Sequence, residues 1–372
     1  MKKYPYIDSL RGVAILLVMM VHTGVSIPHL SPLAAAVIRH GQLGVQLFFV
    51  VSAVTLCLTF EGRSGEADHL AAFYIRRFFR IAPLYWAGII FYFLLGAAMN
   101  HPFSSGFAPQ EQYTPLNIAV NWLFLHGFYP PAINNIVPGG WSIGTEMAFY
   151  AVFPAIFYAA KKLIGGRKLW LFLLPACALL LNIAAQDYIY RAYNVKDTEF
   201  IYFNLINQLP VFMMGISLYF IEVPAVRKRF PVYIDIAGFL VFTLAVTLAW
   251  EYRPAYATAL IPFLAGLSFV FLYGIFFKIK ALNRGWLMKV GQASYSCYLF
   301  HFVFAFNMTK LARKILKSFL PPDAILVVCL VMTVLLTYKV AQLSQRYIEQ
   351  HGIDLGKLLI KRLGRKGVPA HP

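Results

Sequence analysis

Charged residues are scarce in this sequence of 372 residues. They make up 13% of it, whereas hydrophobic residues make up 60%, against roughly a quarter and a half in soluble domains. Acidic residues are the rarest charged class, with 15 Asp and Glu against 33 Lys and Arg. A soluble domain has too little interior for so much apolar side-chain surface. The composition therefore excludes an ordinary soluble fold and predicts an integral membrane protein.

Cysteine is also rare, and its four positions all lie in apolar stretches: Cys57, Cys177, Cys297 and Cys329. No two of them form a C-x-x-C pair, so we expect neither a disulfide framework nor a zinc site. We expect no bound metal and no tightly bound cofactor. The net charge of +18 is compatible with nucleic-acid binding, but no nucleic-acid-binding motif accompanies it. We therefore expect no nucleic-acid partner.

Long apolar runs fill most of the chain. A membrane span needs about 20 apolar residues to cross about 30 Å of hydrocarbon. Ten segments fit this length: 10–26, 42–60, 81–99, 142–160, 169–185, 200–221, 233–250, 255–277, 292–311 and 323–343. A further apolar piece at 116–128 is too short to cross and predicts a re-entrant or surface helix. The expected fold class is all-α, a polytopic integral membrane protein with about ten transmembrane helices.

The basic residues indicate how these spans are oriented. With the N-terminus in the cytoplasm, most of the 33 Lys and Arg residues fall in cytoplasmic segments, as the positive-inside rule requires. The pattern predicts a multi-pass membrane protein with both termini cytoplasmic. We expect it to lie in the bacterial inner (cytoplasmic) membrane. The basic cluster at 313–317 is the one feature against this topology. We expect one transmembrane domain over 1–349 and a basic cytoplasmic tail over 350–372.

The first span carries ionisable side chains, which are costly in a bilayer and usually mark a working site. Arg11 and His22 are separated by about three helical turns, so they lie on one face about 16 Å apart. Asp8 lies one turn before Arg11 and could pair with it. His22 is the best candidate for a general base, because neutral imidazole accepts a hydroxyl proton near neutral pH. The alternative is structural: Arg11 reaches the membrane surface, and His22 hydrogen-bonds a neighbouring helix.

Three arginines, Arg76, Arg77 and Arg80, lie at the cytoplasmic start of the third span. Their helical spacing would cluster the guanidinium groups, and guanidinium groups bind phosphate in a bidentate manner. The cluster is therefore a candidate site for a phosphate-bearing ligand. The alternative is ordinary anchoring beside lipid phosphates at the inner surface.

The fourth span carries Glu146 and Tyr150 one turn apart near its outer end, shortly after Trp141. His22 and Glu146 should lie at similar depths in the membrane, so a histidine–carboxylate pair is geometrically possible. Such a carboxylate would orient the imidazole and stabilise its protonated form. The alternative is a glutamate that faces water on the outer side.

These stretches resemble the membrane-bound acyltransferase-3 family. The segment 6–22 is similar to the family's opening, in which an Arg or Lys is followed after ten residues by His. The segments 72–83 and 138–150 resemble its Arg-x-x-Arg and Trp-Ser-x-x-x-Glu-x-x-x-Tyr motifs. The segment 294–301 resembles its Ser-Tyr-x-x-Tyr-Leu-x-His motif. The segment 44–53 matches the second-span pattern, with Ala53 where Gly is usual.

The resemblance implies a membrane-bound O-acyltransferase that uses acyl-CoA, chiefly acetyl-CoA, as its co-substrate. It implies that His22 is the catalytic base, with Arg11 and Glu146 as further catalytic residues. It also implies that Arg76, Arg77 and Arg80 bind acyl-CoA. The residues expected to line or support the cavity are Asp8, Ser52, Trp141, Tyr150, Tyr298 and His301, although His301 could equally serve helix packing. Transfer directly to the acceptor and transfer through an acyl-enzyme both stay open.

We expect an acetyl group to pass from cytoplasmic acyl-CoA to a hydroxyl of a cell-envelope glycan, such as O-antigen of lipopolysaccharide or an exopolysaccharide. Peptidoglycan is a weaker expectation, because relatives that act on it often carry an extra extracytoplasmic domain. The expected partners are acyl-CoA, a glycan or lipid-linked sugar acceptor, and membrane lipids. A transporter or flippase of a lipid-linked glycan is the alternative from another class, but it would need no coenzyme A site. A non-catalytic relative of the family is a third possibility, against which the intact Arg11 and His22 speak.

Overall fold

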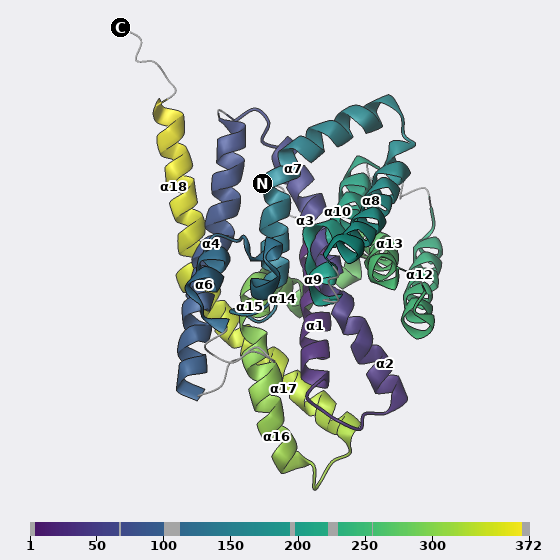
Figure 1. The fold of residues 1–372 in the computed structure, drawn as a ribbon, viewed down its shortest axis with the longest axis vertical. Coiled ribbons are helices and arrows are strands. Elements are labelled where there is room, and N and C mark those ends of the chain that lie inside the picture. Colours follow the sequence, from purple (N-terminus) through teal and green to yellow (C-terminus); the bar gives the residue numbers. More distant parts are fainter. Residues whose placement is uncertain are drawn as a thin grey trace. The chain divides into compact units, whose positions relative to one another are not determined.

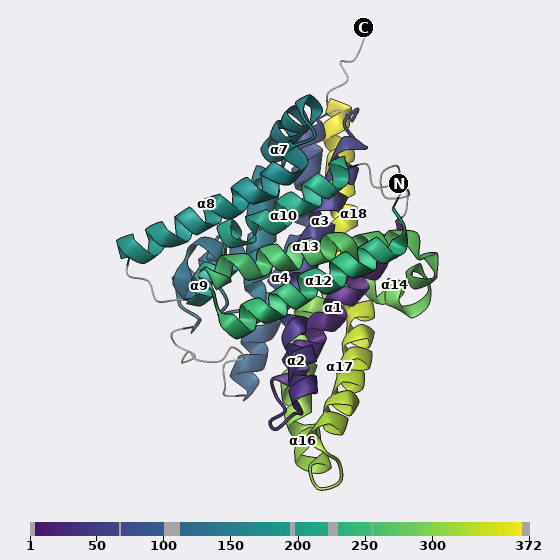
Figure 2. The same ribbon diagram turned by 90° about the vertical axis from the view of Figure 1, so that its right-hand side faces the viewer.

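The computed structural model describes residues 4–66, 68–99, 112–193, 198–221, 230–254 and 256–366. In this part of the chain every regular element is a helix, as Figure 1 and Figure 2 show. Nine of the described helices are long and apolar enough to cross a membrane. The predicted all-α, polytopic membrane fold is therefore confirmed.

The chain divides into two compact units. Unit 1 comprises Met1–Val51, Pro224–Thr247 and Leu264–Gln345, and unit 2 comprises Ser52–Val223, Leu248–Phe263 and Arg346–Pro372. Three of the described α-helices have residues in both units: α3 (Gly44–Glu61), α12 (Val232–Tyr252) and α13 (Ala257–Lys278). Each unit contains some of the predicted site residues, so the two groups of residues are described separately.

Unit 1 is built around the first helix. Its helices are α1 (Pro5–Gly24), α2 (Pro32–His40), α14 (Gly285–Gln292), α15 (Ser294–Phe302), α16 (Thr309–Leu316) and α17 (Pro322–Ser344). Short 3-10 helices occur at Gly41–Leu43 and Lys280–Asn283, and a π-helix at Val303–Met308. Helix α1 contacts α14, α15 and α17, and α16 and α17 form a hairpin (Figure 1).

Unit 2 contains the helices from the middle of the chain and the C-terminal helix. They are α4 (His69–Met99), α6 (Pro115–Trp122), α7 (Gly140–Gly166), α8 (Trp170–Tyr193), α9 (Thr198–Phe203), α10 (Leu205–Phe220) and α18 (Gln350–Lys366). Two 3-10 helices lie between α6 and α7, at His126–Phe128 and Pro130–Ala132. Helix α8 lies beside α10 (Figure 2), and α18 lies beside α4 (Figure 1). A π-helix at Gln345–Glu349 joins α17 to α18.

Two segments refine the predicted span pattern. The predicted ninth span, 292–311, is helical but consists of α15, the π-helix Val303–Met308 and the start of α16, none of which is long enough to cross alone. The apolar piece at 116–128 contains α6, whose 8 residues span only about 12 Å. It is therefore a short helix, as its length predicted. Part of the predicted loop 100–141 and the end of the tail lie outside the described residues.

Several helix starts follow directly from local sequence. Ser31 precedes α2, and its hydroxyl accepts a hydrogen bond from Ala34 N at 3.2 Å. Thr114 caps α6 in the same way through Asn117 N, also at 3.2 Å. Each cap satisfies a backbone N–H that the helix itself leaves unpaired. In both helices proline follows the cap, where its missing N–H costs nothing.

Apolar side chains remain exposed on the outside of the helices. On α8, Phe172 and Leu180 are 70% and 67% exposed, and on α17 Val327 is 61% exposed. Water would make such surfaces prone to aggregation, whereas lipid chains solvate them. The high hydrophobic content of the chain thus has a structural explanation. These helices carry apolar side chains on their exposed faces as well as on their buried faces.

The core of unit 2 is rich in phenylalanine. The ring of Phe60 on α3 lies edge-on to Phe73 of α4 and to Phe153 of α7, with ring centroids 5.2 Å and 5.5 Å away. Phe149 on α7 stacks on Phe212 of α10 at 3.9 Å. Edge-on pairs such as those of Phe60 are a favoured geometry of aromatic rings. These rings pack α3, α4, α7 and α10 against one another. Three of these helices also carry predicted site residues: Ser52 on α3, Arg77 on α4, and Glu146 and Tyr150 on α7.

The unexpected basic cluster at 313–317 lies on and just after α16. One face of α16 packs, through Ala312 and Leu316, on a buried cluster that contains Ile325. The Arg313 guanidinium donates a 3.0 Å hydrogen bond to the Ser26 carbonyl. Arg313 therefore holds the turn that follows α1, which gives one residue of the cluster a structural role.

Candidate active site

Two histidines meet in unit 1. His22 lies in the last turn of α1, and His301 lies near the end of α15. Their ring centroids are 5.2 Å apart. The His22 ring also contacts Phe302 and Phe306, at 4.4 Å and 5.7 Å. The sequence placed both histidines in the candidate site but did not predict that they are neighbours.

The hydrogen bond of His301 determines where its proton lies. Its Nδ1 is 2.6 Å from the carbonyl oxygen of Tyr298. A carbonyl can only accept, so we assign the proton to Nδ1. The Nε2 atom is buried and has no hydrogen-bond partner among the described residues. In the neutral ring it carries a lone pair that can accept a proton or a hydrogen bond.

The π-helix Val303–Met308 begins two residues after His301. Such local widenings of a helix are rare and often occur at functional sites. Here the widening carries Phe306, which contacts the His22 ring. Tyr298, one turn before His301, is buried and lies edge-on to Phe48 at 6.1 Å. The predicted residues Tyr298 and His301 thus belong to the surroundings of His22.

The N-terminal half of α1 is held by a close helix–helix contact. A Cβ atom added at Gly12 would lie 2.3 Å from Leu287 O, and one added at Gly291 would lie 1.7 Å from Asp8 O. Only glycine at both positions allows α1 and α14 to approach so closely. At this level Gln292 donates a 3.1 Å hydrogen bond to the Asp8 carboxylate. Arg11, three residues further along, is half-buried.

Unit 2 contains a carboxylate with two hydroxyl partners. The Ser52 hydroxyl of α3 donates to Glu146 Oε1 on α7 at 2.5 Å. The Tyr150 hydroxyl, one turn after Glu146, donates to the same oxygen. The two hydroxyl oxygens are 3.4 Å apart. Ser52, Glu146 and Tyr150 were predicted separately as site residues, and the structure joins them in one hydrogen-bonded group.

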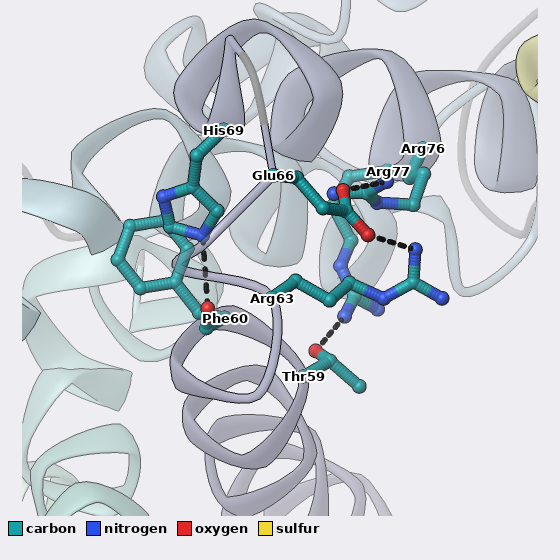
Figure 3. Close-up of polar contacts among 7 residues, drawn as sticks. All are labelled: Thr59, Phe60, Arg63, Glu66, His69, Arg76 and Arg77. Atoms are coloured by element: carbon teal, nitrogen blue, oxygen red, sulfur yellow. Dashed lines mark hydrogen bonds and ion pairs between the residues drawn. The ribbon is translucent and has the colours of Figure 1, made fainter. Parts of the chain in front are cut away.

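Arg77 connects this group to the start of α4. Its Cζ lies 5.7 Å from the centre of the Tyr150 ring and 5.8 Å from that of Phe73. Its Nη2 donates to the Thr59 hydroxyl at 2.6 Å (Figure 3). Cation–ring contacts of this kind are favourable where water is excluded. A polar path therefore runs from Thr59 through Arg77 and Tyr150 to Glu146.

The neighbouring arginine has different partners. Arg76 Nη1 is 2.8 Å from Glu66 Oε2, and Arg63 Nη1 is 3.2 Å from Glu66 Oε1 (Figure 3). Arg80 is half-buried and forms no ion pair among the residues that the structure describes. The three predicted arginines therefore do not share one partner. Arg76 contacts the turn between α3 and α4, whereas Arg77 points into unit 2 and contacts Thr59 and Tyr150.

The start of α7 is fixed by its own turn. Gly139 has φ +72°, in the left-handed region that favours glycine, and its N–H donates to Asn134 Oδ1 at 2.9 Å. Trp141 is buried and stacks on Phe203 with ring centroids 4.3 Å apart. Trp141 therefore acts in this structure as a packing residue that sets the position of α7 near Glu146.

His126 supports the same turn. Its Nε2 donates to Gly140 O at 2.9 Å, and its ring stacks on Tyr85 at 5.7 Å. The Tyr85 hydroxyl donates to Asn121 Oδ1 at 2.9 Å. A Cβ added at Gly144 would lie 2.5 Å from His126 Nε2, so a glycine there makes room for the ring. Sequence reasoning gave His126 no role, because nothing local marks its partners.

Burial of His126 predicts a dependence of stability on pH. Burial lowers its pKa to about 4, whereas an unfolded histidine has a pKa of about 6.5. The neutral ring therefore contributes its full stability above about pH 6.5, and this contribution is lost as the pH falls towards about 4. By linkage the loss at pH 5 is about 2 kcal/mol. In His126→Gln, the melting temperature in detergent should fall less between pH 7.5 and pH 5 than in the unmodified protein. An unchanged pH dependence would contradict a buried neutral ring.

The structure thus places the predicted residues in two groups. In unit 1, His22 lies with Tyr298 and His301, and in unit 2, Glu146 lies with Ser52 and Tyr150. Because His22 and Glu146 belong to different units, their predicted pairing stays a prediction. Sequence reasoning missed Glu66 and His126. The signal for Glu66 was present, since an acidic residue among arginines stands out in a chain with only 15 Asp and Glu.

Comparison with known proteins places these residues in a family. The family model described as "Acyltransferase domain", acyltransferase-3, matches residues 4–340. The chain belongs to this family. The matched range includes His22 and His301, the arginines of α4, and the Ser52–Glu146–Tyr150 group. The family predicted from the sequence motifs is therefore confirmed.

Two relatives of this acyltransferase-3 protein are O-acetyltransferases. Peptidoglycan O-acetyltransferase OatA of Listeria monocytogenes is 24% identical over 371 residues, which cover 94% of this chain and 56% of the relative. O-acetyltransferase OatA of Staphylococcus aureus is 25% identical over 376 residues, which cover 93% of this chain and 56% of the relative. The chain thus spans little more than half the length of these relatives. No solved structure matches it significantly.

Proposed function

We propose that this protein is a membrane-bound O-acyltransferase that moves an acetyl group from cytoplasmic acetyl-CoA to a hydroxyl of a cell-envelope glycan. The observation that carries the proposal is the contact between His22 and His301 in a chain of the acyltransferase-3 family. Two imidazoles at 5.2 Å, one with an unpartnered Nε2, provide the proton-accepting group that acyl transfer to a hydroxyl needs.

In the proposed reaction, His22 accepts the proton of the acceptor hydroxyl. The oxygen attacks the thioester carbonyl carbon, the C–S bond breaks, and coenzyme A leaves as its thiol after taking the proton from His22. His301, held by its bond to the Tyr298 carbonyl, keeps the neighbouring ring in place and offers Nε2 as a second acceptor. A covalent acyl-enzyme would split the same transfer into two steps of this kind.

The arginines of α4 support the choice of donor. Coenzyme A carries a diphosphate and a 3′-phosphate, and guanidinium groups are the usual partners of such groups. Arg76 lies near the surface, and Arg77 leads through Tyr150 to Glu146. A transporter of a lipid-linked glycan would need no coenzyme A site, and the named relatives are O-acetyltransferases, which is why we favour the enzyme.

The acceptor is proposed from the names of the relatives and from the sequence. The relatives are called O-acetyltransferases, and one is named for peptidoglycan. Peptidoglycan therefore joins O-antigen and exopolysaccharide as an acceptor to be tested. We propose the inner membrane as the location, with both termini in the cytoplasm, on the basis of the basic-residue pattern.

Mass spectrometry of surface glycans tests the proposal. O-antigen, exopolysaccharide and peptidoglycan are isolated from cells with and without the gene. We expect one fraction to lose the mass of an acetyl substituent, and restoring the gene should restore it. Membranes that contain the protein should also transfer label from acetyl-labelled acetyl-CoA to that fraction. Unchanged acetylation in all three fractions would reject the proposal. A change in the amount of exported glycan, with its acetylation intact, would favour the transporter.

A further inference from the structure

The turn between α3 and α4 holds one carboxylate between two guanidinium groups. Glu66 Oε1 lies 3.2 Å from Arg63 Nη1, and Glu66 Oε2 lies 2.8 Å from Arg76 Nη1 (Figure 3). Each oxygen thus has its own arginine. The two arginines come from different segments, Arg63 from the turn and Arg76 from the second turn of α4. Their guanidinium groups converge on one small anion.

The pairs of Glu66 are exposed enough to exchange with a ligand. The side chains of Arg63, Arg76 and Glu66 are 29%, 22% and 38% exposed. Ion pairs at this exposure contribute little to stability, because water solvates the separated charges almost as well. A carboxylate has one negative charge and two oxygens. A phosphate group offers the same two-oxygen face, a third oxygen and up to two charges.

Arg77 has other partners. It donates to Thr59 and lies over the Tyr150 ring, whereas Arg63 was not among the predicted donor-binding residues. The pair Arg63 and Arg76 is therefore distinct from the predicted donor-binding set Arg76, Arg77 and Arg80. Arg63 and Arg76, by contrast, share the carboxylate of Glu66, an anion that the chain itself supplies.

We propose that Arg63 and Arg76 form a phosphate-binding site and that Glu66 occupies it as an internal competitor until a phosphate group of the nucleotide donor displaces it. This inference rests on the proposed function for the identity of the donor, but the anion site itself does not. The exchange involves no covalent change. Glu66 leaves for water, and the phosphate takes its two guanidinium partners.

Replacing Glu66 with Gln tests the site directly. The change removes the competitor and keeps the size of the side chain, so coenzyme A should bind about three- to ten-fold more tightly than to the unmodified protein, as expected for the loss of two partly exposed ion pairs. The measurement is calorimetric titration of the full chain in detergent with coenzyme A, 3′-dephospho-coenzyme A and inorganic pyrophosphate as separate probes. A gain for coenzyme A alone assigns the site to the 3′-phosphate. A gain for both nucleotides assigns it to the diphosphate.

Asp68→Asn is the matched control. It makes the same change in charge two residues away, and Asp68 is exposed and forms no ion pair among the described residues. Its φ of +51° is one that asparagine adopts readily. We expect less than about a two-fold effect, since only screened long-range charge changes. In the double variant Arg63→Gln with Glu66→Gln, the gain should disappear because one of the two guanidinium groups is gone.

The outcomes separate this inference from the proposed function. Equal affinities of Glu66→Gln and the unmodified protein for all three probes would overturn the internal-competitor site. So would an equal gain in Asp68→Asn, which would reflect net charge. If coenzyme A binds no variant but pyrophosphate binds Glu66→Gln more tightly, the anion site stands and the proposed donor falls.

Discussion

Replacing His22 with Ala should lower acyl transfer by about 10²–10⁴-fold, the usual contribution of a positioned general base. Alanine removes the group that accepts the hydroxyl proton and leaves the rest of unit 1 in place. Donor binding should stay unchanged, because no arginine of α4 belongs to that unit. Transfer of labelled acetyl groups in membranes gives the rate, and calorimetry with coenzyme A gives the affinity.

Two further variants show whether the loss is specific. His351 lies exposed on α18, so His351→Ala should transfer at the normal rate. His301→Asn keeps a donor near the position of Nδ1, able to reach the Tyr298 carbonyl, but removes Nε2. Near-normal transfer in His22→Ala together with a loss in His301→Asn would move the base from His22 to His301. Normal transfer in both variants would remove the histidines from the mechanism.

The positions of most membrane helices along the chain could be predicted from composition and the length of apolar runs, because a bilayer requires a similar length for every crossing. This reasoning also identified 116–128 as too short, and α6 bears that out. It was less successful at 292–311, where the chain forms α15, a π-helix and α16. A π-helix depends on how side chains such as Phe306 pack on other helices, and hydropathy does not report that packing.

The residues of the site could be named from motifs, but their partners could not. Helical spacing correctly placed Glu146 one turn from Tyr150, and the structure adds Ser52 to that pair. Spacing also suggested that Arg76 and Arg77 act together, whereas one contacts Glu66 and the other Thr59. Neighbouring residues on a helix point about 100° apart. Which of them faces a turn and which faces the interior depends on tertiary contacts.

If Glu146 orients the catalytic histidine as the sequence predicts, replacing it with Gln should lower acyl transfer by up to about 10⁴-fold, the loss seen when the carboxylate of a Ser-His-Asp triad becomes an amide. Glutamine keeps the size and one carbonyl oxygen, which can still accept from Ser52 and Tyr150, but it loses the negative charge. The melting temperature should therefore change little. In Glu146→Ala, by contrast, two buried hydroxyl groups lose their acceptor, and each such loss costs about 1–3 kcal/mol. Glu146→Ala should therefore be both inactive and less stable.

The comparison of these variants decides what the carboxylate does. Ser52→Ala and Tyr150→Phe each remove one hydrogen bond, worth about 1 kcal/mol, and should lower transfer only several-fold. Normal transfer in Glu146→Gln would reduce Glu146 to a structural acceptor for its two hydroxyl partners.

The double variant His22→Ala with Glu146→Gln tests whether the effects of the two residues are coupled. If the two residues act as one unit, the double variant should be no slower than the slower single variant, because groups that act together are not additive. If the losses multiply instead, the carboxylate acts on the reaction independently of His22.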